Sequence, residues 1–122
     1  MEFYIIEIKH PIYECMYECT LKSEEMIVGK CQFICAKNAW IEKLVVHNPY
    51  RRQGYGTNLL QYVETFLISK GVKKIGLISL TDEGDTMTRK QLQNFYFKNG
   101  YNCVATNKFT GETSNEMRKI KR

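Results

Sequence analysis

The hydrophobic pattern of the chain changes abruptly at Gly54, and this change limits the fold more than any other feature of the sequence. Before Gly54, turn-forming or polar residues separate four segments rich in β-branched and aromatic residues: 2–9, 13–21, 26–36 and 39–46. Such segments predict β-strands, mostly antiparallel. After Gly54, apolar residues recur at intervals of three and four, which predicts a helix that closes at Ser69-Lys70-Gly71.

The second half of the chain completes an α/β pattern. It contains three more predicted strands, near residues 73–80, 101–106 and 113–120. The first of these is expected to lie parallel to 39–46, because a strand–helix–strand unit usually crosses over in that way. A second helix is predicted at about 88–98, ending at Asn99-Gly100, and residues 107–111 have the composition of a hairpin turn. We therefore predict an α/β fold with a mixed, mostly antiparallel sheet of about six or seven strands and two main helices.

Length and composition exclude several classes of protein. With 122 residues the chain has room for one domain, residues 1–122. The N-terminus lacks the pattern of a signal peptide, and no apolar stretch approaches the roughly 18 residues that cross a bilayer, so neither export nor a membrane is expected. The five cysteines, an odd number, lie in apolar runs. They are expected to be reduced core residues of a cytoplasmic protein.

Charge and cysteine spacing leave fewer functions open. The net charge of +5 suits nucleic acid, an acidic surface or a phosphorylated cofactor. The basic residues are scattered, apart from Arg51-Arg52 and residues 118–122, which argues against a nucleic-acid binder. On a strand, the spacings Cys15-x-x-x-Cys19 and Cys31-x-x-x-Cys35 span about 13 Å. Two sulfurs that share one zinc lie much closer together, so no metal is expected.

The turn before the first predicted helix suits an anion. Strand 39–46 runs through residues 47–50 into the segment Arg51-Arg52-Gln53-Gly54-Tyr55-Gly56-Thr57. Main-chain N–H groups and the positive end of the helix dipole converge there, and the two glycines let the main chain approach a pyrophosphate. The dinucleotide-binding fingerprint would need glycine or alanine where Leu59 stands, and a P-loop would need Gly-Lys-Ser/Thr. A purely structural turn is the alternative.

Two blocks resemble one enzyme family. Residues 44–56, with Arg51-x-x-Gly54-x-Gly56, closely resemble motif A of the GNAT acetyltransferases, whose pattern is Arg/Gln-x-x-Gly-x-Gly/Ala. Residues 94–101 are similar to the family's later helix, where a tyrosine precedes three residues and a glycine–aromatic pair. The resemblance, over roughly residues 40–105, implies a small single-domain GNAT member with its N-terminal helices reduced or absent.

The resemblance implies an N-acetyltransferase that moves the acetyl group of acetyl-coenzyme A to a primary amine. The acceptor would be a small amine, a polyamine, or an amine of a protein or peptide. The alternative is a catalytically inactive GNAT-fold module that binds coenzyme A or a partner protein.

The resemblance also implies where acetyl-coenzyme A binds. Strand 39–46 would splay from its parallel neighbour and leave main-chain groups for the pantetheine arm, at Leu44, Val45 and Val46. The pyrophosphate would lie on the turn, contacted by Arg51, Arg52, Gln53, Gly54, Tyr55, Gly56 and Thr57. Asn94 belongs to the second block, and Arg89 stands where many members carry an asparagine that helps to hold the cofactor arm. Both are expected cofactor contacts.

Acyl transfer needs a deprotonated amine, donors for an oxyanion and an acid for the leaving thiolate. The resemblance assigns the Val46 N–H to the thioester carbonyl and Tyr96 to the acid, with a core tyrosine as the alternative. Glu42 is the candidate base, because some polyamine-acetylating members carry a glutamate there; a solvated glutamate is the alternative. Alternation is expected to place Trp40, Glu42, Leu44 and Val46 on one face, with Trp40 lining the acceptor pocket.

The acceptor side is expected to be open. Asp82 and Glu83 follow the predicted parallel strand, at the rim where substrates of α/β folds bind, and would attract a cationic amine. A solvated acidic loop is the alternative. Family members usually carry one or two helices between the first two strands, as a wall of the acceptor site. Here only His10-Pro11-Ile12 intervenes, so the site is expected to be open or completed by a partner chain in a homodimer.

Overall fold

The β-rich first half of the chain forms a continuous antiparallel meander. Its strands are β1 (Glu2–Ile8), β2 (Met16–Ser23), β3 (Met26–Cys35) and β4 (Ala39–Val46). The four predicted strands are confirmed, although β2 begins and ends later than residues 13–21. The structure is a computed structural model that describes residues 1–9, 11, 15–51, 53–78, 89–106 and 115–120.

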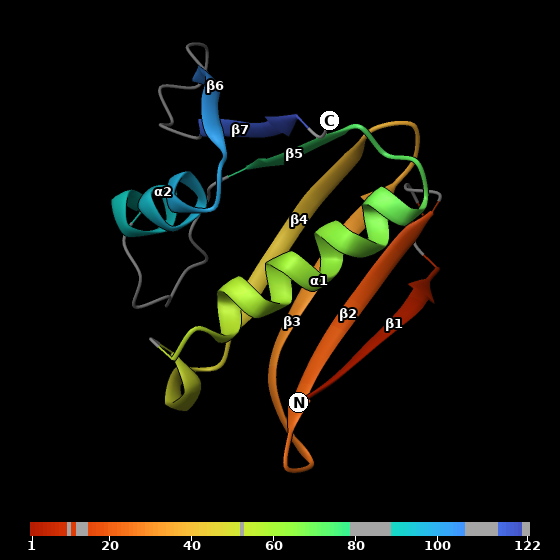
Figure 1. The fold of residues 1–122 in the computed structure, drawn as a ribbon, viewed down its shortest axis with the longest axis vertical. Coiled ribbons are helices and arrows are strands. Elements are labelled where there is room, and N and C mark those ends of the chain that lie inside the picture. The colour runs from red at the N-terminus through yellow and green to blue at the C-terminus, as the bar shows by residue number, and fades with distance from the viewer. Residues whose placement is uncertain (10, 12–14, 52, 79–88, 107–114, 121–122) are drawn as a thin grey trace.

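The second half adds the helices and the rest of the sheet. Its elements are the 3₁₀ turn η1 (Asn48–Tyr50), α1 (Tyr55–Ser69), β5 (Lys74–Ile78), α2 (Arg89–Lys98), β6 (Asn102–Thr106) and β7 (Asn115–Ile120). β5 lies parallel to β4, and β7 lies between β5 and β6, so the strand order is β1-β2-β3-β4-β5-β7-β6. This seven-stranded mixed sheet with two helices confirms the predicted fold (Figure 1).

The turn between β2 and β3 shows tertiary structure overriding residue preference. Glu24 and Glu25 both have positive φ, 50° and 67°. A two-residue hairpin turn that matches the twist of its strands needs positive φ at both central positions, where asparagine and glycine are preferred. Here glutamates occupy both central positions, at a cost of about 1–2 kcal/mol for each residue in the left-handed region.

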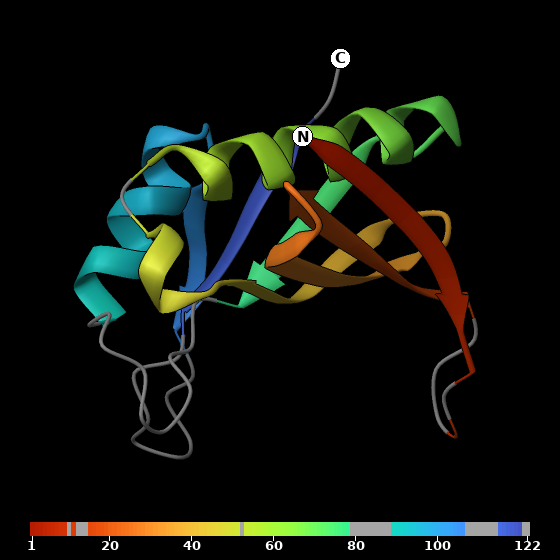
Figure 2. The ribbon, with the colours of Figure 1, turned by 90° about the horizontal axis from the view of Figure 1, so that it is seen from below.

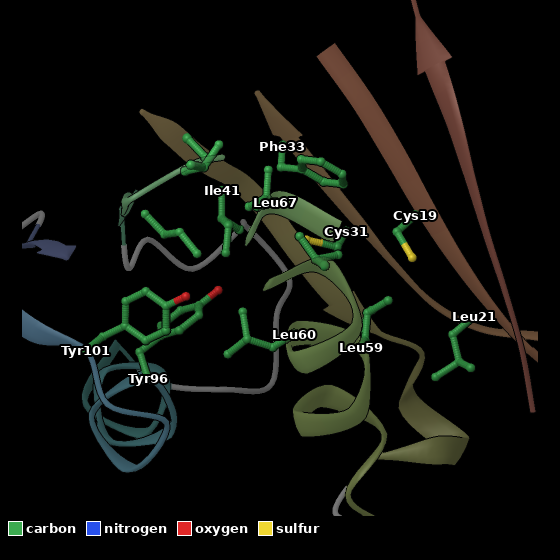
Figure 3. Packing of buried hydrophobic residues seen from close by; sticks show 14 of the residues in the cluster. Cys19, Leu21, Cys31, Phe33, Ile41, Leu59, Leu60, Leu67, Tyr96 and Tyr101 are labelled. Carbon is green, nitrogen blue, oxygen red and sulfur yellow. The ribbon is translucent and has the colours of Figure 1, made fainter. Parts of the chain in front are cut away.

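Helix α1 lies across β2, β3 and β4 on one face of the sheet (Figures 1 and 2). The side chains that recur at helical spacing are fully buried: Leu59, Leu60, Val63 and Leu67. They form one core cluster with residues of the strands, such as Cys31 and Phe33, and with Tyr96 of α2 (Figure 3). α2 therefore flanks α1 and shares its core.

The end of α1 confirms the predicted glycine stop. Gly71 has φ 84° and donates its N–H to Ile68 O at 3.0 Å, and Val72 donates to Leu67 O at 3.1 Å. These bonds define a Schellman cap, in which a left-handed residue turns the chain out of the helix. The cap directs the chain into β5, beside the strand that precedes α1.

Candidate active site

Strand β4 has two halves with different neighbours. Residues 39–41, the paired half, pair with β3 on one side and with β5 on the other. Residues 42–46, the splayed half, continue along β3, while β5 pairs with β4 only as far as Ile41 within the described residues. The described parts of the two parallel strands diverge in Figure 1, in the way that the family resemblance implied. Main-chain groups of the splayed half face the gap.

A β-bulge at Glu42 separates the two halves. Ile41 pairs with Phe33 and Lys43 pairs with Gln32, so Glu42 is an extra residue on β4. A bulge bends its strand and increases the local twist. The bulge thus lies where the pairing of β4 with β5 ends, and Glu42 is exposed at this point.

The bulge overturns the expected arrangement of Trp40, Glu42, Leu44 and Val46 on one face of the strand. Leu44 pairs with the buried Cys31, and Leu44 and Val46 both pack against the core. The extra residue shifts the alternation by one position, so Trp40 lies on the opposite face from Leu44 and Val46. The prediction was wrong because it assumed an unbroken period of two.

Trp40 packs over a glycine instead. It lies between the buried Ala39 and Ile41 in the sequence and therefore points to the other face of the sheet. Its register partner on β5 is Gly76, where an added Cβ would come within 2.6 Å of the indole ring. The glycine leaves room for the ring, which covers the face of the paired half that lies away from α1.

The N–H of Val46 points toward the gap. The next residue, His47, donates its N–H to Val28 O of β3 at 2.8 Å. Main-chain groups of successive strand residues point to opposite sides, so the N–H and C=O of Val46 are directed away from β3. The bond from Arg51 Nε to Val46 O, 2.8 Å long, fits this direction. A main-chain donor thus lies at the end of β4 on the side of the gap.

The turn before α1 contains a left-handed glycine. Gly54 is the N-cap of α1, has φ 83°, and accepts the N–H of Asn58 at 3.1 Å. Apart from Gly54 and its two neighbours in the chain, no described residue has an atom within 4 Å of the place where its Cβ would be. The space outside the first turn of α1 is therefore open, and the positive end of the helix dipole faces it.

Gly56 has a different role from Gly54. Its missing Cβ faces the ring of Phe95 on α2 at 3.3 Å and the side chain of Val46 at 3.6 Å. It therefore permits α1, α2 and the end of β4 to approach one another. Tyr50 and Tyr55 flank the turn, with ring centroids 6.4 Å apart.

The tyrosine–glycine–aromatic block builds the end of α2. Gly100 has φ 93° and donates to Phe97 O at 3.0 Å, and Tyr101 donates to Tyr96 O at 3.1 Å. This is a second Schellman cap, in which the residues at the positions of Tyr96 and Tyr101 usually make a hydrophobic contact. Their rings lie edge to face with centroids 5.9 Å apart. The spacing that carried the resemblance therefore also has a structural cause.

Tyr96 is buried, with only 3% of its surface exposed. Burial raises the pKa of its hydroxyl, and the nearby Cys31 raises it further. Figure 3 shows the side chains of Tyr96 and Tyr101 pointing into the core cluster. The hydroxyl of Tyr96 thus stays protonated at neutral pH, as both a general acid and a core tyrosine require.

The buried carboxylate of Glu64 was not predicted from the sequence. It lies on α1 with 5% of its surface exposed and accepts a 2.8 Å hydrogen bond from the hydroxyl of Tyr101. Burial and the Glu64 carboxylate raise the pKa of Tyr101. The signal was present, because Glu64 follows Leu60 by four residues and precedes Leu67 by three, which places it near the apolar face of the helix.

The other predicted site residues are exposed, half-buried or outside the described residues. Gln53 and Asn94 are exposed, and Thr57 is half-buried in the first turn of α1. Arg52, Asp82 and Glu83 lie outside the described residues, and Arg89 is described only as the first residue of α2. β1 and β2 are joined by residues 9–15, and in their described part no helix is present.

The cysteines are only partly as expected. Cys19 and Cys31 are buried, but Cys15 is exposed and Cys35 is partly exposed, which corrects the expectation that all are core residues. The side chain of Cys103 lies outside the described residues. No group of three or more metal-binding side chains occurs in the part of the chain that the structure describes. Neither described helix has the length and apolar character of a membrane span.

Comparison with known protein families identifies the family of this chain. A family model described as an acetyltransferase (GNAT) domain matches residues 13–103, about three quarters of the sequence. The chain belongs to the GNAT acetyltransferase family. No curated protein sequence matches it significantly.

Solved structures share the fold. The PaiA N-acetyltransferase of Thermoplasma acidophilum, in complex with coenzyme A, superposes with a TM-score of 0.71 at 20% identity, over 86% of this chain and 60% of that one. An aminoglycoside 6′-N-acetyltransferase complexed with coenzyme A gives 0.71 at 22% identity, over 87% and 73%. A Bacillus cereus acetyltransferase gives 0.69 at 25% identity, over 86% and 72%. The chain thus spans less than two thirds of the Thermoplasma protein.

Proposed function

We propose that this protein binds acetyl-coenzyme A and transfers its acetyl group to a primary amine. The observation that carries the proposal is the gap between β4 and β5, which opens at the Glu42 bulge and leads toward the left-handed turn at Gly54. The solved relatives from Thermoplasma and of the aminoglycoside type hold coenzyme A on the same fold. Family membership supports the same reaction class.

The cofactor would lie along the splayed half of β4. The pantetheine arm has amide groups that pair with a strand edge, and Leu44, Val45 and Val46 form the part of β4 that is not paired with β5. The pyrophosphate would lie in the open space outside Gly54, on main-chain N–H groups of the first turn of α1. Arg51 and Arg52 add positive charge to the turn.

Acetyl transfer needs a hydrogen-bond donor for the oxyanion, a general acid and a general base. The Val46 N–H, directed toward the gap, would stabilise the oxyanion that forms on the thioester carbonyl. Tyr96, protonated and buried, would give its proton to the departing thiolate of coenzyme A. Glu42, exposed on the bulge, would accept the proton of the attacking amine directly or through water.

The burial of Tyr96 favours one second candidate, a GNAT-fold module that binds coenzyme A without catalysis. Its 3% exposure and its place in a helix cap suffice to explain a tyrosine at this position. The two candidates differ in one measurable respect. Tyr96→Phe keeps the ring and the cap, so it lowers the rate of transfer in an enzyme and changes nothing in a binding module.

Cofactor binding is tested first, by isothermal titration with acetyl-coenzyme A. Gly54 and Gly71 form a matched pair at the two ends of α1, with φ 83° and 84°, and beyond their own chain neighbours no described residue lies within 4 Å of either missing Cβ. Gly54→Asp places a carboxylate beside the proposed pyrophosphate, while Gly71→Asp makes the same change at the other end. We expect micromolar binding by the wild-type protein, weakened about tenfold or more, or about 1.4 kcal/mol, in Gly54→Asp alone.

Equal affinities of the two variants would contradict the proposed pyrophosphate site. Absence of binding to the wild-type protein would contradict the whole proposal. Thermal unfolding of both variants shows whether either change disturbs the fold.

The acceptor is tested next, by following release of coenzyme A with a thiol reagent. Small amines, polyamines, aminoglycosides and peptide N-termini are the classes to compare. The short link between β1 and β2, residues 9–15, supports an open acceptor site that takes a bulky amine. Asp82 and Glu83 are the residues proposed to contact it, and a homodimer in which the partner chain closes the site would appear as a dimer in sedimentation.

A further inference from the structure

The hairpin of β2 and β3 carries two pairs of cysteines that lie opposite each other. Cys19 and Cys31 are register partners in the middle of the hairpin. Met16 pairs with Ile34 at its open end, so the next pair outward is Cys15 and Cys35. This outer pair is joined by a hydrogen bond from Cys35 N–H to Cys15 O, 3.0 Å long.

The two pairs differ in backbone and in surroundings: Cys19 and Cys31 are regular strand partners, whereas Cys15 lies just before β2 with φ 59° and is held opposite Cys35 by the main-chain hydrogen bond. Residues directly opposite in a hydrogen-bonded pair have Cα atoms about 5.5 Å apart, within the range of about 4.4–6.8 Å that disulfides span. Cys19 and Cys31 have no exposed surface. Cys15 is exposed, and Cys35 is partly exposed. Only the outer pair can therefore meet a reagent in solution.

The pKa shifts of the thiols also separate the inner pair, Cys19 and Cys31, from the outer pair. Burial raises the pKa of Cys19 to about 12 and that of Cys31 well above its usual value. Burial and the neighbouring Cys15 also raise the pKa of Cys35, but the ammonium group of Lys70 acts in the opposite direction. A thiolate, the form that attacks a disulfide, is therefore far less accessible at the inner pair.

We propose that Cys15 and Cys35 are a thiol–disulfide modification site, oxidised by a low-molecular-weight disulfide of the glutathione type. The exposed Cys15 thiolate attacks one sulfur of the oxidant, which forms a mixed disulfide and releases one thiol. The Cys35 thiolate then attacks the sulfur of Cys15 and releases the second thiol. The two protein thiols together lose two electrons and two protons, and the two released thiols take up these electrons and protons.

The disulfide would fasten the start of β2 to the end of β3. In Figure 1 this end of the hairpin lies toward the C-terminal end of α1, whereas Gly54 lies at the other end of the helix. The proposal therefore does not depend on acetyl transfer. Closing the hairpin loop should also raise the melting temperature of the oxidised protein, by about 5 °C or more.

The test oxidises the native protein with oxidised glutathione, blocks the remaining thiols with iodoacetamide and maps the peptides by mass spectrometry. We expect one disulfide, between Cys15 and Cys35, reversed by dithiothreitol, with Cys19 and Cys31 modified only after unfolding. In Cys35→Ser the reaction should stop at a stable glutathione adduct of Cys15. Cys19→Ala serves as the control and should form the disulfide like the wild-type protein.

Three results would overturn the proposal. The first is lasting glutathione adducts on Cys15 or Cys35 of the wild-type protein without a bridge between them. The second is a disulfide that involves Cys19, Cys31 or Cys103 under native conditions. The third is the absence of any oxidation while Cys15 is alkylated readily.

Discussion

The paired half and the splayed half of β4 belong to one strand and share one antiparallel partner, yet they have different roles. The paired half, residues 39–41, is held by β3 and β5 and carries the buried Ala39 and Ile41. The splayed half, residues 42–46, is held by β3 alone among the described strands, and its residues are half-buried or exposed. One extra residue, Glu42, marks the change from a strand paired on both sides to one edge of the proposed cofactor site.

The largest expected effect concerns the core under the paired half. Ile41 is 3% exposed, whereas Leu44 in the splayed half is only half-buried. Ile41→Ala should lower the free energy of unfolding by about 3 kcal/mol, because it leaves a cavity among packed side chains. Leu44→Ala should cost about 1 kcal/mol, because less surface is buried there. Urea unfolding of the two variants measures both values, and equal losses would show that the halves are packed alike.

The second effect concerns the bulge itself. Deletion of Glu42 makes Ile41 and Lys43 consecutive opposite Phe33 and Gln32, which restores a regular strand. The straightened β4 should pair further along β5 and close the gap. We expect the affinity for acetyl-coenzyme A to fall about 100-fold, or about 2.7 kcal/mol, while the stability changes by about 1 kcal/mol or less.

Glu42→Ala is the control for this deletion, because it keeps the bulge and removes only the carboxylate. Its affinity for acetyl-coenzyme A should stay within about twofold of the wild-type value. Titration calorimetry compares the three proteins. A deletion variant that still binds like the wild-type protein would show that the bulge is not what opens the gap.

The third effect compares two glycines, one beside each half. A Cβ at Gly29 would lie 2.6 Å from Val45 O, a main-chain atom of the splayed half, and a Cβ at Gly76 would lie 2.6 Å from the ring of Trp40. Either alanine substitution should cost about 2 kcal/mol through overpacking. Because the main chain of β4 has to move in Gly29→Ala, this variant alone should also bind acetyl-coenzyme A less tightly.

A double-mutant cycle with Trp40→Leu tests whether the Trp40 ring packs over Gly76. This substitution removes the ring that Gly76→Ala would strike, so the double variant should be more stable than the sum of the two single changes predicts. Thermal unfolding of the four proteins in the cycle measures this coupling. Strict additivity would contradict the packing of Trp40 over Gly76.

The smallest effect concerns the tyrosine that completes the core beside α1. Tyr101→Phe removes the hydrogen bond to Glu64 and should cost about 1 kcal/mol at neutral pH. The pKa of Tyr101 is raised in the folded protein, so its hydroxyl stays protonated where that of the unfolded chain ionises, above about pH 10. The stability that it contributes is therefore complete below that pH and is lost as the pH rises.

Stability measured from pH 8 to pH 11 checks the direction of this effect. The wild-type protein should lose stability more steeply than Tyr101→Phe above pH 10. A steeper slope in Tyr101→Phe would contradict the assignment.

Part of the backbone around the candidate site could be predicted from local sequence. Gly54 and Gly71 were predicted at the two ends of α1, and both have the left-handed conformation that glycine adopts without strain. The parallel pairing of β4 with β5 was also predicted, because short crossovers of this kind are right-handed and place the two strands side by side. The roles of Glu42, Tyr96 and the residues of the turn in acetyl transfer remain predictions.

The errors arose where one segment depends on another. The face of Trp40 could not be predicted, since the bulge at Glu42 exists only through the register of β4 against β3. The exposure of Cys15 depends in the same way on where β2 begins. The hydrogen bond of Glu64 also joins distant segments, because its donor, Tyr101, is 37 positions away.

The sequence by itself therefore determined the order of strands and helices, the glycine-capped ends of α1 and the family to which the chain belongs. The elements and the caps follow from local backbone preferences and from hydrophobic periodicity, which act over a few neighbouring residues. The family follows from the resemblance of residues 44–56 and 94–101 to GNAT motifs. The tertiary structure alone decided where β4 leaves β5, which face each of its side chains takes, and which cysteines reach solvent. Strand register and burial arise from contacts between distant segments, and a single extra residue in one strand changes them.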